Sequence, residues 1–319
     1  MKKLFIVFCI FYSSISIANR PSWINSPMDN CSKIREICAV GEGTGVINAE
    51  ASARDAIARI FKTNVNSNLT SITETKQVLK DDVVTGEESS DFAQRIKLTT
   101  EEVIKGVQIK QTYTDQDYVY ALASLDKKKV STIFKEQMDQ IDIEIESNYK
   151  KGSRSSLSKA EKLYKVRSEI HEKFLIVNNS KYPSKISLKK IHNKKLKKVS
   201  LNTTIYVDVN ELNDRPLLKN LIIQGLLDND YRVVTNKKSN YQFIVRGSFK
   251  EEKLFFKVKG FEKYQFLLQL YSEKKSGEKL GGLHLTEAQV GRSHRQALSN
   301  ALPSLKKSLL DRIDELKLD

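Results

Sequence analysis

The first eighteen residues constrain the compartment, and with it the fold, more than any other part of the chain. Lysines precede an apolar run, and the small residues Ser16 and Ala18 form a cleavage signature. Ser13 and Ser14 interrupt the apolar run, which leaves it too short to cross a bilayer core of about 30 Å. We therefore expect residues 1–18 to be a secretory signal peptide and the mature chain to be periplasmic.

The expected periplasmic location determines how the three cysteines are interpreted. Cys9 follows the bulky Phe8 inside the apolar run, whereas an acylated cysteine must follow a small residue at its end, so we expect no lipidation. Removal of the signal leaves Cys31 and Cys38, an even number in an oxidising environment, which predicts a disulfide. On one straight helix their Cα atoms would lie roughly 10 Å apart, so the bond requires a loop or hairpin. A zinc site is the alternative, but no CxxC occurs and the nearest histidine is His171.

The charge is strongly basic, formally +15, and unevenly spread. Outside the cytoplasm nucleic acid is an improbable partner, and anionic lipid, anionic envelope polymer or an acidic protein surface fits better. Residues 178–200 contain many lysines and no acidic residue. We interpret them as a solvated linker, with a surface for anionic lipid or peptidoglycan as the alternative. The candidate contact residues of that surface are Lys189, Lys190, Lys194, Lys195, Lys197 and Lys198.

Hydrophobic periodicity predicts an α+β domain over residues 19–128. A short buried strand, ICAVGEG, precedes a helix that begins near Asn48 and carries an alanine-rich apolar stripe. Residues 73–90 are polar and weakly patterned, which favours an exposed loop, and a short helix then ends at Gly106. Two alternating segments around TDQD predict a β-hairpin.

The rest of the chain predicts a helical hairpin and a second α+β domain. Residues 129–177 form two charged helical stretches separated by KGSR. Residues 201–319 contain successive strands, among them KLFFKVKG, and helices that we expect to pack on a mostly antiparallel sheet. Asp214 is the expected cap of the first of these helices, and Pro303 is expected to kink or divide the last one.

The sequence contains no convincing catalytic or cofactor motif. Gly41, Gly43 and Gly45 form GxGxG, but the dinucleotide fingerprint requires GxGxxG in a parallel βαβ unit, so a tight strand-to-helix turn is the better interpretation. Histidines are scattered, and no GxSxG is present. We expect no enzyme activity, no metal and no cofactor.

A resemblance adds to this interpretation. The ordered segments PSWI, AVGEG, AEASARDAIARIF, GVQI and YVYALASLD resemble the LPP-twenty lipoprotein family and the first domain of the flagellar assembly protein T. Within residues 201–319, the ordered segments TIYVDV, YQFIVRGSF and YQFLLQLYS resemble the domain shared by the N-terminal part of TolB and the middle of the flagellar assembly protein T. The resemblance implies noncatalytic roles in the outer envelope, including periplasmic rings around a flagellar motor. The chain departs from the lipoproteins in lacking a lipidation site and in carrying the inserted cysteine pair.

We therefore expect a noncatalytic periplasmic envelope protein that mediates protein assembly, with flagellar basal-body or outer-membrane proteins as partners. The alternative is a hydrolase or binding module for peptidoglycan or lipid. Its faint candidate residues are Asp115, Asp117 and His294.

Overall fold

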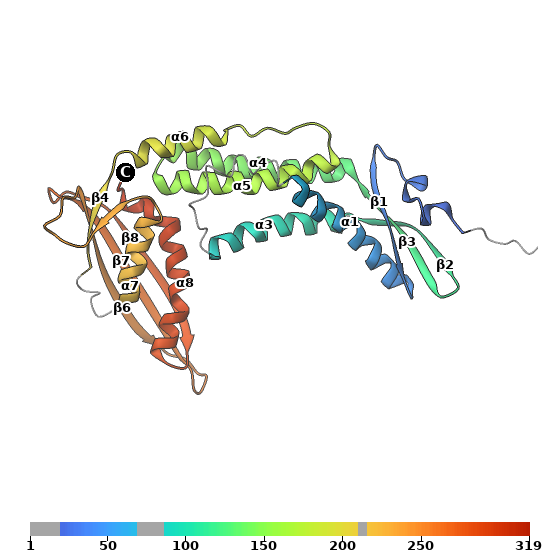
Figure 1. The fold of residues 1–319 in the computed structure, drawn as a ribbon. Coiled ribbons are helices and arrows are strands. Elements are labelled where there is room, and N and C mark those ends of the chain that lie inside the picture. Colours follow the sequence, from blue (N-terminus) through green and yellow to red (C-terminus); the bar gives the residue numbers. More distant parts are fainter. Residues whose placement is uncertain (1–19, 69–85, 210–215) are drawn as a thin grey trace, which may run out of the picture. The chain divides into compact units, whose positions relative to one another are not determined.

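The computed structural model describes residues 20–68, 86–209 and 216–319. The expected signal peptide and the expected cap Asp214 lie outside these residues. The predicted α+β class is confirmed, with one three-stranded and one five-stranded sheet among the described residues (Figure 1). The chain divides into two compact units, residues 1–62 with 103–128 and residues 63–102 with 129–319, called here the N-terminal and C-terminal units.

The N-terminal unit is an antiparallel sheet of order β1-β3-β2. Its elements are η1 (Ser22–Ile24), η2 (Pro27–Asn30), β1 (Glu36–Gly43), α1 (Val46–Asn68), β2 (Gln108–Asp115) and β3 (Tyr118–Asp126). The predicted hairpin is present, and Gln116 in its turn has a positive φ of 38°.

The two faces of this sheet are covered by different parts of the chain. On one face Ala49, Ala53 and Ile57 of α1 are fully buried, as the predicted stripe requires. On the other face Trp23 packs with Cys38 and Leu122. Strand alternation explains this division, because successive side chains of β1 point to opposite faces.

Helix α3 (Gly86–Lys105) corrects the expected loop over residues 73–90, because residues 86–90 are helical. The remainder of that expected loop lies largely outside the described residues. The helix ends before Gly106, as predicted. Ile96 and Val103 lie on one face of the helix, half-buried and fully buried, whereas Leu98 is 54% exposed.

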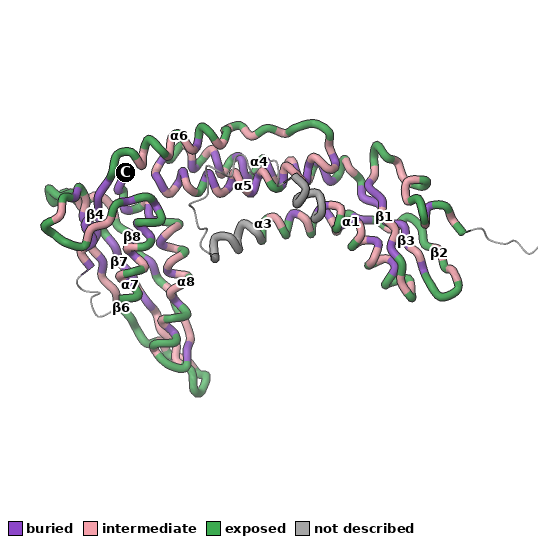
Figure 2. Tube along the Cα trace, viewed as in Figure 1, coloured by how far each residue is buried: buried purple, intermediate pink, exposed green. Residues whose placement is uncertain are grey.

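The C-terminal unit includes a two-helix arm formed by α4 (Lys127–Lys151) and α5 (Arg154–Val177), the predicted helical hairpin. Gly152 has a φ of +70°, which ends α4, and the Ser153 side chain caps α5 by accepting from the Ser156 amide. Twenty-four residues give α5 a length of about 36 Å. Phe134 and Phe174 are fully buried within the arm, and Figure 2 shows buried stretches, in purple, along both α4 and α5.

Residues 188–199, which we expected to be part of a solvated lysine-rich linker, form helix α6 (Leu188–Val199) alongside α5. Ile191 is fully buried and anchors the helix. Lysine is a good helix former, so a run of lysines around a few apolar contacts is compatible with a packed helix. High lysine content alone was therefore a poor indicator of an unstructured linker.

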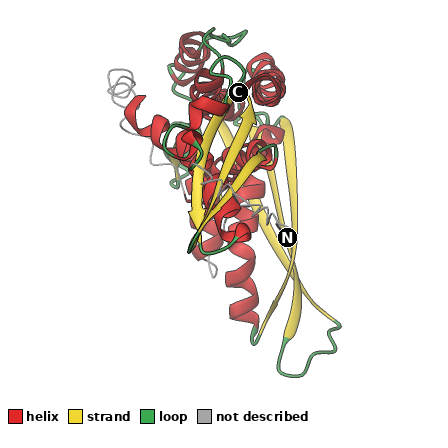
Figure 3. Ribbon diagram, turned by 90° about the vertical axis from the view of Figure 1, so that its right-hand side faces the viewer, coloured by secondary structure: helices red, strands yellow, loops and turns green. Residues whose placement is uncertain are grey.

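The rest of the C-terminal unit is a five-stranded sheet of order β5-β4-β6-β7-β8 with helices on one face (Figure 3). Its elements are β4 (Thr204–Asp208), α7 (Pro216–Leu227), β5 (Arg232–Val234), β6 (Phe243–Leu254), β7 (Glu262–Lys274), β8 (Lys279–Gly291), α8 (His294–Arg312) and η4 (Ile313–Leu316). The sheet is mixed, because β4 pairs in parallel with β5 and β6 and the other pairs are antiparallel. Apolar side chains of α7 and α8 pack on it around Val245, Leu268 and Leu270.

Two local expectations for this sheet are corrected. The segment KLFFKVKG is not a separate strand: β6 continues to Leu254, and residues 255–261 form the loop to β7. Helix α8 runs through Pro303, so the proline does not divide the helix, which was one of the two outcomes that we expected. Burial of Ala297, Ala301 and Leu305 against the sheet offsets the backbone hydrogen bond that proline removes.

Candidate functional site

Cys31 and Cys38 form a disulfide with their Cα atoms 6.3 Å apart. The bond connects the N-terminal segment to β1. Within the loop, the Glu36 carboxylate accepts hydrogen bonds from the Ser32 amide at 2.9 Å and from Lys110 Nζ at 3.0 Å. These two bonds lower the pKa of Glu36. The two sulfurs and this carboxylate lie within 4.8 Å of one another, a spacing suited to a metal, but the sulfurs are bonded to each other. The arrangement is therefore a structural brace.

The glycine triplet does not form a phosphate-binding loop. Gly41 and Gly43 lie within β1, and a Cβ on Gly41 would overlap the backbone of α1 at Ala53. Only Gly45 belongs to the turn, and a Cβ there would meet nothing within 4 Å. The glycines of the strand serve close helix packing, rather than the tight turn that we predicted.

The six candidate lysines of α6 do not form one surface. Lys194 donates to the Tyr149 carbonyl and lies 4.3 Å from the centre of the Tyr149 ring. Lys195 lies 3.4 Å from carboxylate oxygens of Glu161 and of Asp230. These two lysines fasten α6 to its neighbours. The exposed lysines are Lys189, Lys190 and Lys197, which share one face of the helix, while Lys198 is half-buried.

Arg154, at the start of α5, is fully buried and joins several segments of the C-terminal unit. Its side chain donates to the Asp319 carboxylate at 3.1 Å, the Asp230 carbonyl at 2.5 Å, the Lys198 carbonyl at 2.9 Å and the Thr203 hydroxyl at 2.9 Å. Its guanidinium also lies 4.7 Å from the centre of the Tyr231 ring. We call this cluster the Arg154 junction, and it binds α5, α6 and the sheet region into one body.

A second buried ion pair fixes the connection between α5 and α6. Arg167 of α5 lies 2.8 Å from the Asp142 carboxylate of α4, and both side chains are at most 4% exposed. Ser184 also donates to Asp142, and the Tyr182 carbonyl accepts from Arg167. Residues 178–187 are therefore held against the arm.

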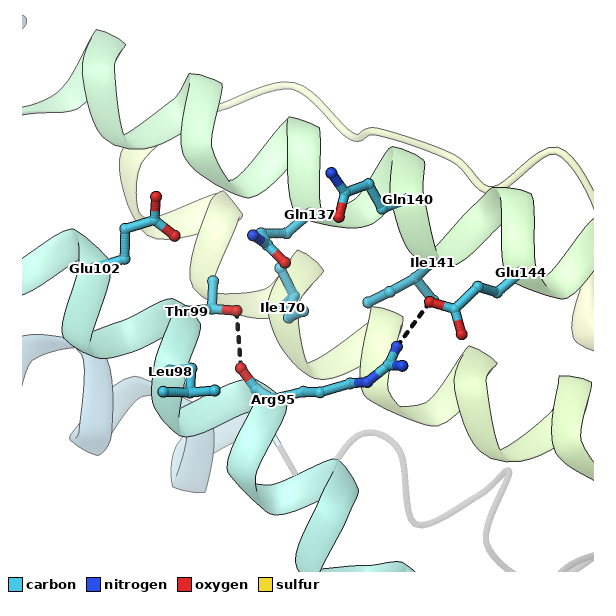
Figure 4. Close-up of a pocket in the computed structure, with 9 residues that line it drawn as sticks. All are labelled: Arg95, Leu98, Thr99, Glu102, Gln137, Gln140, Ile141, Glu144 and Ile170. Atoms are coloured by element: carbon cyan, nitrogen blue, oxygen red, sulfur yellow. Dashed lines mark hydrogen bonds and ion pairs between the residues drawn. The ribbon is translucent and has the colours of Figure 1, made fainter. Parts of the chain in front are cut away.

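A shallow groove of about 280 Å³ lies between α3 and α4 (Figure 4). Arg95 crosses it to the Glu144 carboxylate at 2.9 Å. The other lining residues are Leu98, Thr99, Glu102, Gln137, Gln140, Ile141 and Ile170. This lining supplies amides, carboxylates and an ion-paired arginine, and none of these described lining residues is a cysteine, serine or histidine. The groove is polar and open, and it offers no paired nucleophile and base.

The faint catalytic candidates are distributed between the two units. Asp115 and Asp117 flank the turn of the β2–β3 hairpin in the N-terminal unit. In the C-terminal unit His294 Nε2 lies 2.8 Å from a Glu251 oxygen and its ring contacts Tyr264 edge-on. His294 thus connects the start of α8 to the β6–β7 hairpin.

The sequence reasoning missed the loop at residues 255–261. Phe255 is 85% exposed, and Val258 and Phe261 are also exposed. We predicted a strand over KLFFKVKG, but the glycine at 260 and the alternating lysines are the signals that could have indicated a loop.

Comparisons with known proteins show no matching family model and no matching curated protein. Two solved structures are similar in part. A minor lipoprotein from Acinetobacter baumannii is 13% identical, with a TM-score of 0.24, over 37% of this chain and 84% of its own. A secreted protein from the human pathogen Helicobacter pylori is 10% identical, with a TM-score of 0.34, over 88% of this chain and 98% of its own. In the described part of the chain, no helix is both long enough and apolar enough to cross a membrane.

Proposed function

We propose that this chain is a noncatalytic periplasmic protein of the cell envelope that acts as a rigid binding component of a larger assembly. The Arg154 junction carries the proposal, because one buried side chain fastens the two-helix arm and α6 to the sheet region. An arm of about 36 Å fixed to an α+β body holds binding surfaces at set separations, as a scaffold requires.

The brace between Cys31 and Cys38 supports the periplasmic location. Disulfides persist in the oxidising envelope and are rare in the cytosol. The signal-peptide pattern of residues 1–18 points to the same compartment.

Basal-body or outer-membrane proteins are the partners we propose, from the resemblance of residues 19–128 to the LPP-twenty family and to the flagellar assembly protein T. The test is co-sedimentation of the native protein with purified basal bodies, compared with outer-membrane and soluble periplasmic fractions, followed by crosslinking and mass spectrometry. We expect enrichment in one particulate fraction and reproducible crosslinks to a small set of proteins.

A matched pair of variants connects that test to the structure. Arg154→Ala removes the junction. Lys159 lies on the same helix as Arg154, and Lys159→Ala removes only an exposed ion pair with Asp311 of α8. We expect Arg154→Ala to lose crosslinks made by the arm and Lys159→Ala to keep them. A protein that stays soluble without crosslinks would contradict the assembly role, and product released from purified peptidoglycan or lipid would contradict the noncatalytic role.

A further inference from the structure

The β6–β7 hairpin ends in a loop that carries three exposed large apolar side chains. Its loop, residues 255–261 with the sequence FFKVKGF, is called here the aromatic loop. Phe255 is 85%, Val258 52% and Phe261 40% exposed. Exposed apolar side chains that cluster usually mark a binding surface, whereas isolated ones do not.

The loop has a defined conformation. The Phe261 amide donates to the Val258 carbonyl at 3.2 Å, and Gly260 has a φ of +81°, which a side chain would disfavour. Strands β6 and β7 on either side of the loop are paired without a break, starting at Leu254 and Lys263, so both ends of the loop are fixed. Figure 1 shows the loop at the end of the hairpin that lies away from the C-terminal end of α8. The aromatic loop therefore has a fixed backbone conformation at the end of the hairpin.

Basic side chains surround the apolar ones. Residues 253–263 contain four lysines and one glutamate. That glutamate, Glu262, is already paired with Lys253 and accepts from the Tyr264 hydroxyl at 2.8 Å. Lys257 and Lys259 are exposed, and the Arg292 guanidinium lies 5.8 Å from the centre of the Phe261 ring. The rim of the loop is therefore positive.

We propose that the aromatic loop inserts Phe255, Val258 and Phe261 into the interface of a membrane that contains anionic lipid, with Lys257 and Lys259 at the headgroups. Apolar side chains in a basic rim match an interface that is apolar beneath and negative above. These side chains are exposed at the end of a hairpin, so a protein partner would need a matching pocket, whereas a bilayer deforms around inserted side chains. This lipid site goes beyond the proposed protein-binding role.

The test is flotation of the full mature protein with vesicles of phosphatidylcholine alone and with added phosphatidylglycerol. We expect binding only to the anionic vesicles, and weaker binding as salt rises. Phe255→Ser should weaken binding about tenfold or more, because burial of a phenylalanine is lost. Lys257→Gln with Lys259→Gln should weaken it and flatten the salt dependence.

Two controls locate the effect. Ile143→Ser removes a side chain that is 62% exposed on α4 and should leave binding unchanged. Lys189→Gln with Lys190→Gln removes exposed charge from α6 and should change it little. An equal loss in the α6 variant would move the site from the loop to α6 and overturn the proposal.

A spectroscopic measurement provides independent evidence of insertion. Trp23 is the only tryptophan, and it is 3% exposed. A Phe255→Trp variant therefore adds one exposed indole, which brominated anionic lipid should quench while Trp23 in the unchanged protein stays unquenched. Absence of anionic-vesicle binding, or binding without quenching of the new indole, would overturn the proposal. Neither result would alter the protein crosslinks that test the assembly role.

Discussion

Gly41 of β1 faces the backbone of Ala53 of α1 so closely that no side chain fits between them. We expect Gly41→Ala to destabilise the N-terminal unit by about 1 to 3 kcal/mol, since the strand and helix must separate. Gly45→Ala is the matched control because a Cβ there meets nothing within 4 Å. It should change the free energy of unfolding by less than about 0.5 kcal/mol. Chemical denaturation of both variants, followed by hydrogen exchange in β1, measures the difference, and equal stabilities would refute close packing at Gly41.

The Arg154 junction predicts a large loss of stability in the C-terminal unit. Arg154→Ala leaves the Asp319 carboxylate without its buried partner and should cost about 3 to 5 kcal/mol. Arg154→Lys keeps the charge but cannot reproduce the planar fork, so it should recover only part of the loss. Lys159→Ala, at an exposed pair, should cost at most about 1 kcal/mol. Thermal unfolding and hydrogen exchange at α5 and β4 measure the loss of stability in each variant. Equal losses in all three variants would contradict the structural role of Arg154.

The disulfide predicts a redox-dependent stability of the N-terminal unit. Closing so short a loop contributes about 2 to 3 kcal/mol in the chain-entropy model. Reductant should therefore loosen the segment that carries Trp23, and a Cys31→Ser, Cys38→Ser variant should start loose and not respond to reductant. Limited proteolysis with and without reductant measures this. Free thiols at both cysteines in mass spectrometry of the nonreduced mature protein would disprove the bond.

His171 predicts a pH dependence on the acid side of neutrality. Burial, with a further contribution from Arg167, lowers the pKa of His171 below its usual 6.5. The unfolded chain then takes up this proton first as pH falls, so stability is full above pH about 6.5 and declines as pH falls through the lower folded pKa. His171→Gln keeps an acceptor for the Tyr182 amide and should reduce the slope. Denaturation midpoints from pH about 7.5 to 5 test this, and an unchanged slope in the variant would assign the dependence to other groups.

Periodicity was sufficient to predict the features that repeat along the chain. The stripe from Ala49 to Phe61, the hairpin at residues 108–126 and the two helices of the arm all follow from spacings of 3.6 or 2 residues. Compartment and cysteine parity were enough to pair Cys31 with Cys38. These predictions need only local sequence and one chemical condition.

The remaining features depend on contacts between distant residues, which no local pattern encodes. Arg154 reaches Asp230 and Asp319, which are 76 and 165 residues away in sequence. Lys194 and Lys195 have the same composition signal as the exposed Lys189, and only packing of α6 distinguishes them. The aromatic loop has the hydrophobicity of a strand, and its exposure follows from where the sheet ends.

Because α5 begins at the Arg154 junction, a force on the arm is transmitted to the sheet region. A force on the far end of the arm passes along the helices and reaches the sheet region at the root of α5, through Arg154 and through Ser156, which donates to the Asp314 carboxylate. The Arg154 side chain distributes that force over three stretches of the chain: Lys198 and Thr203, Asp230 and Tyr231, and Asp319. Because the root of the arm is fixed to the sheet region, a force at the far end of the arm acts on the strands as a torque.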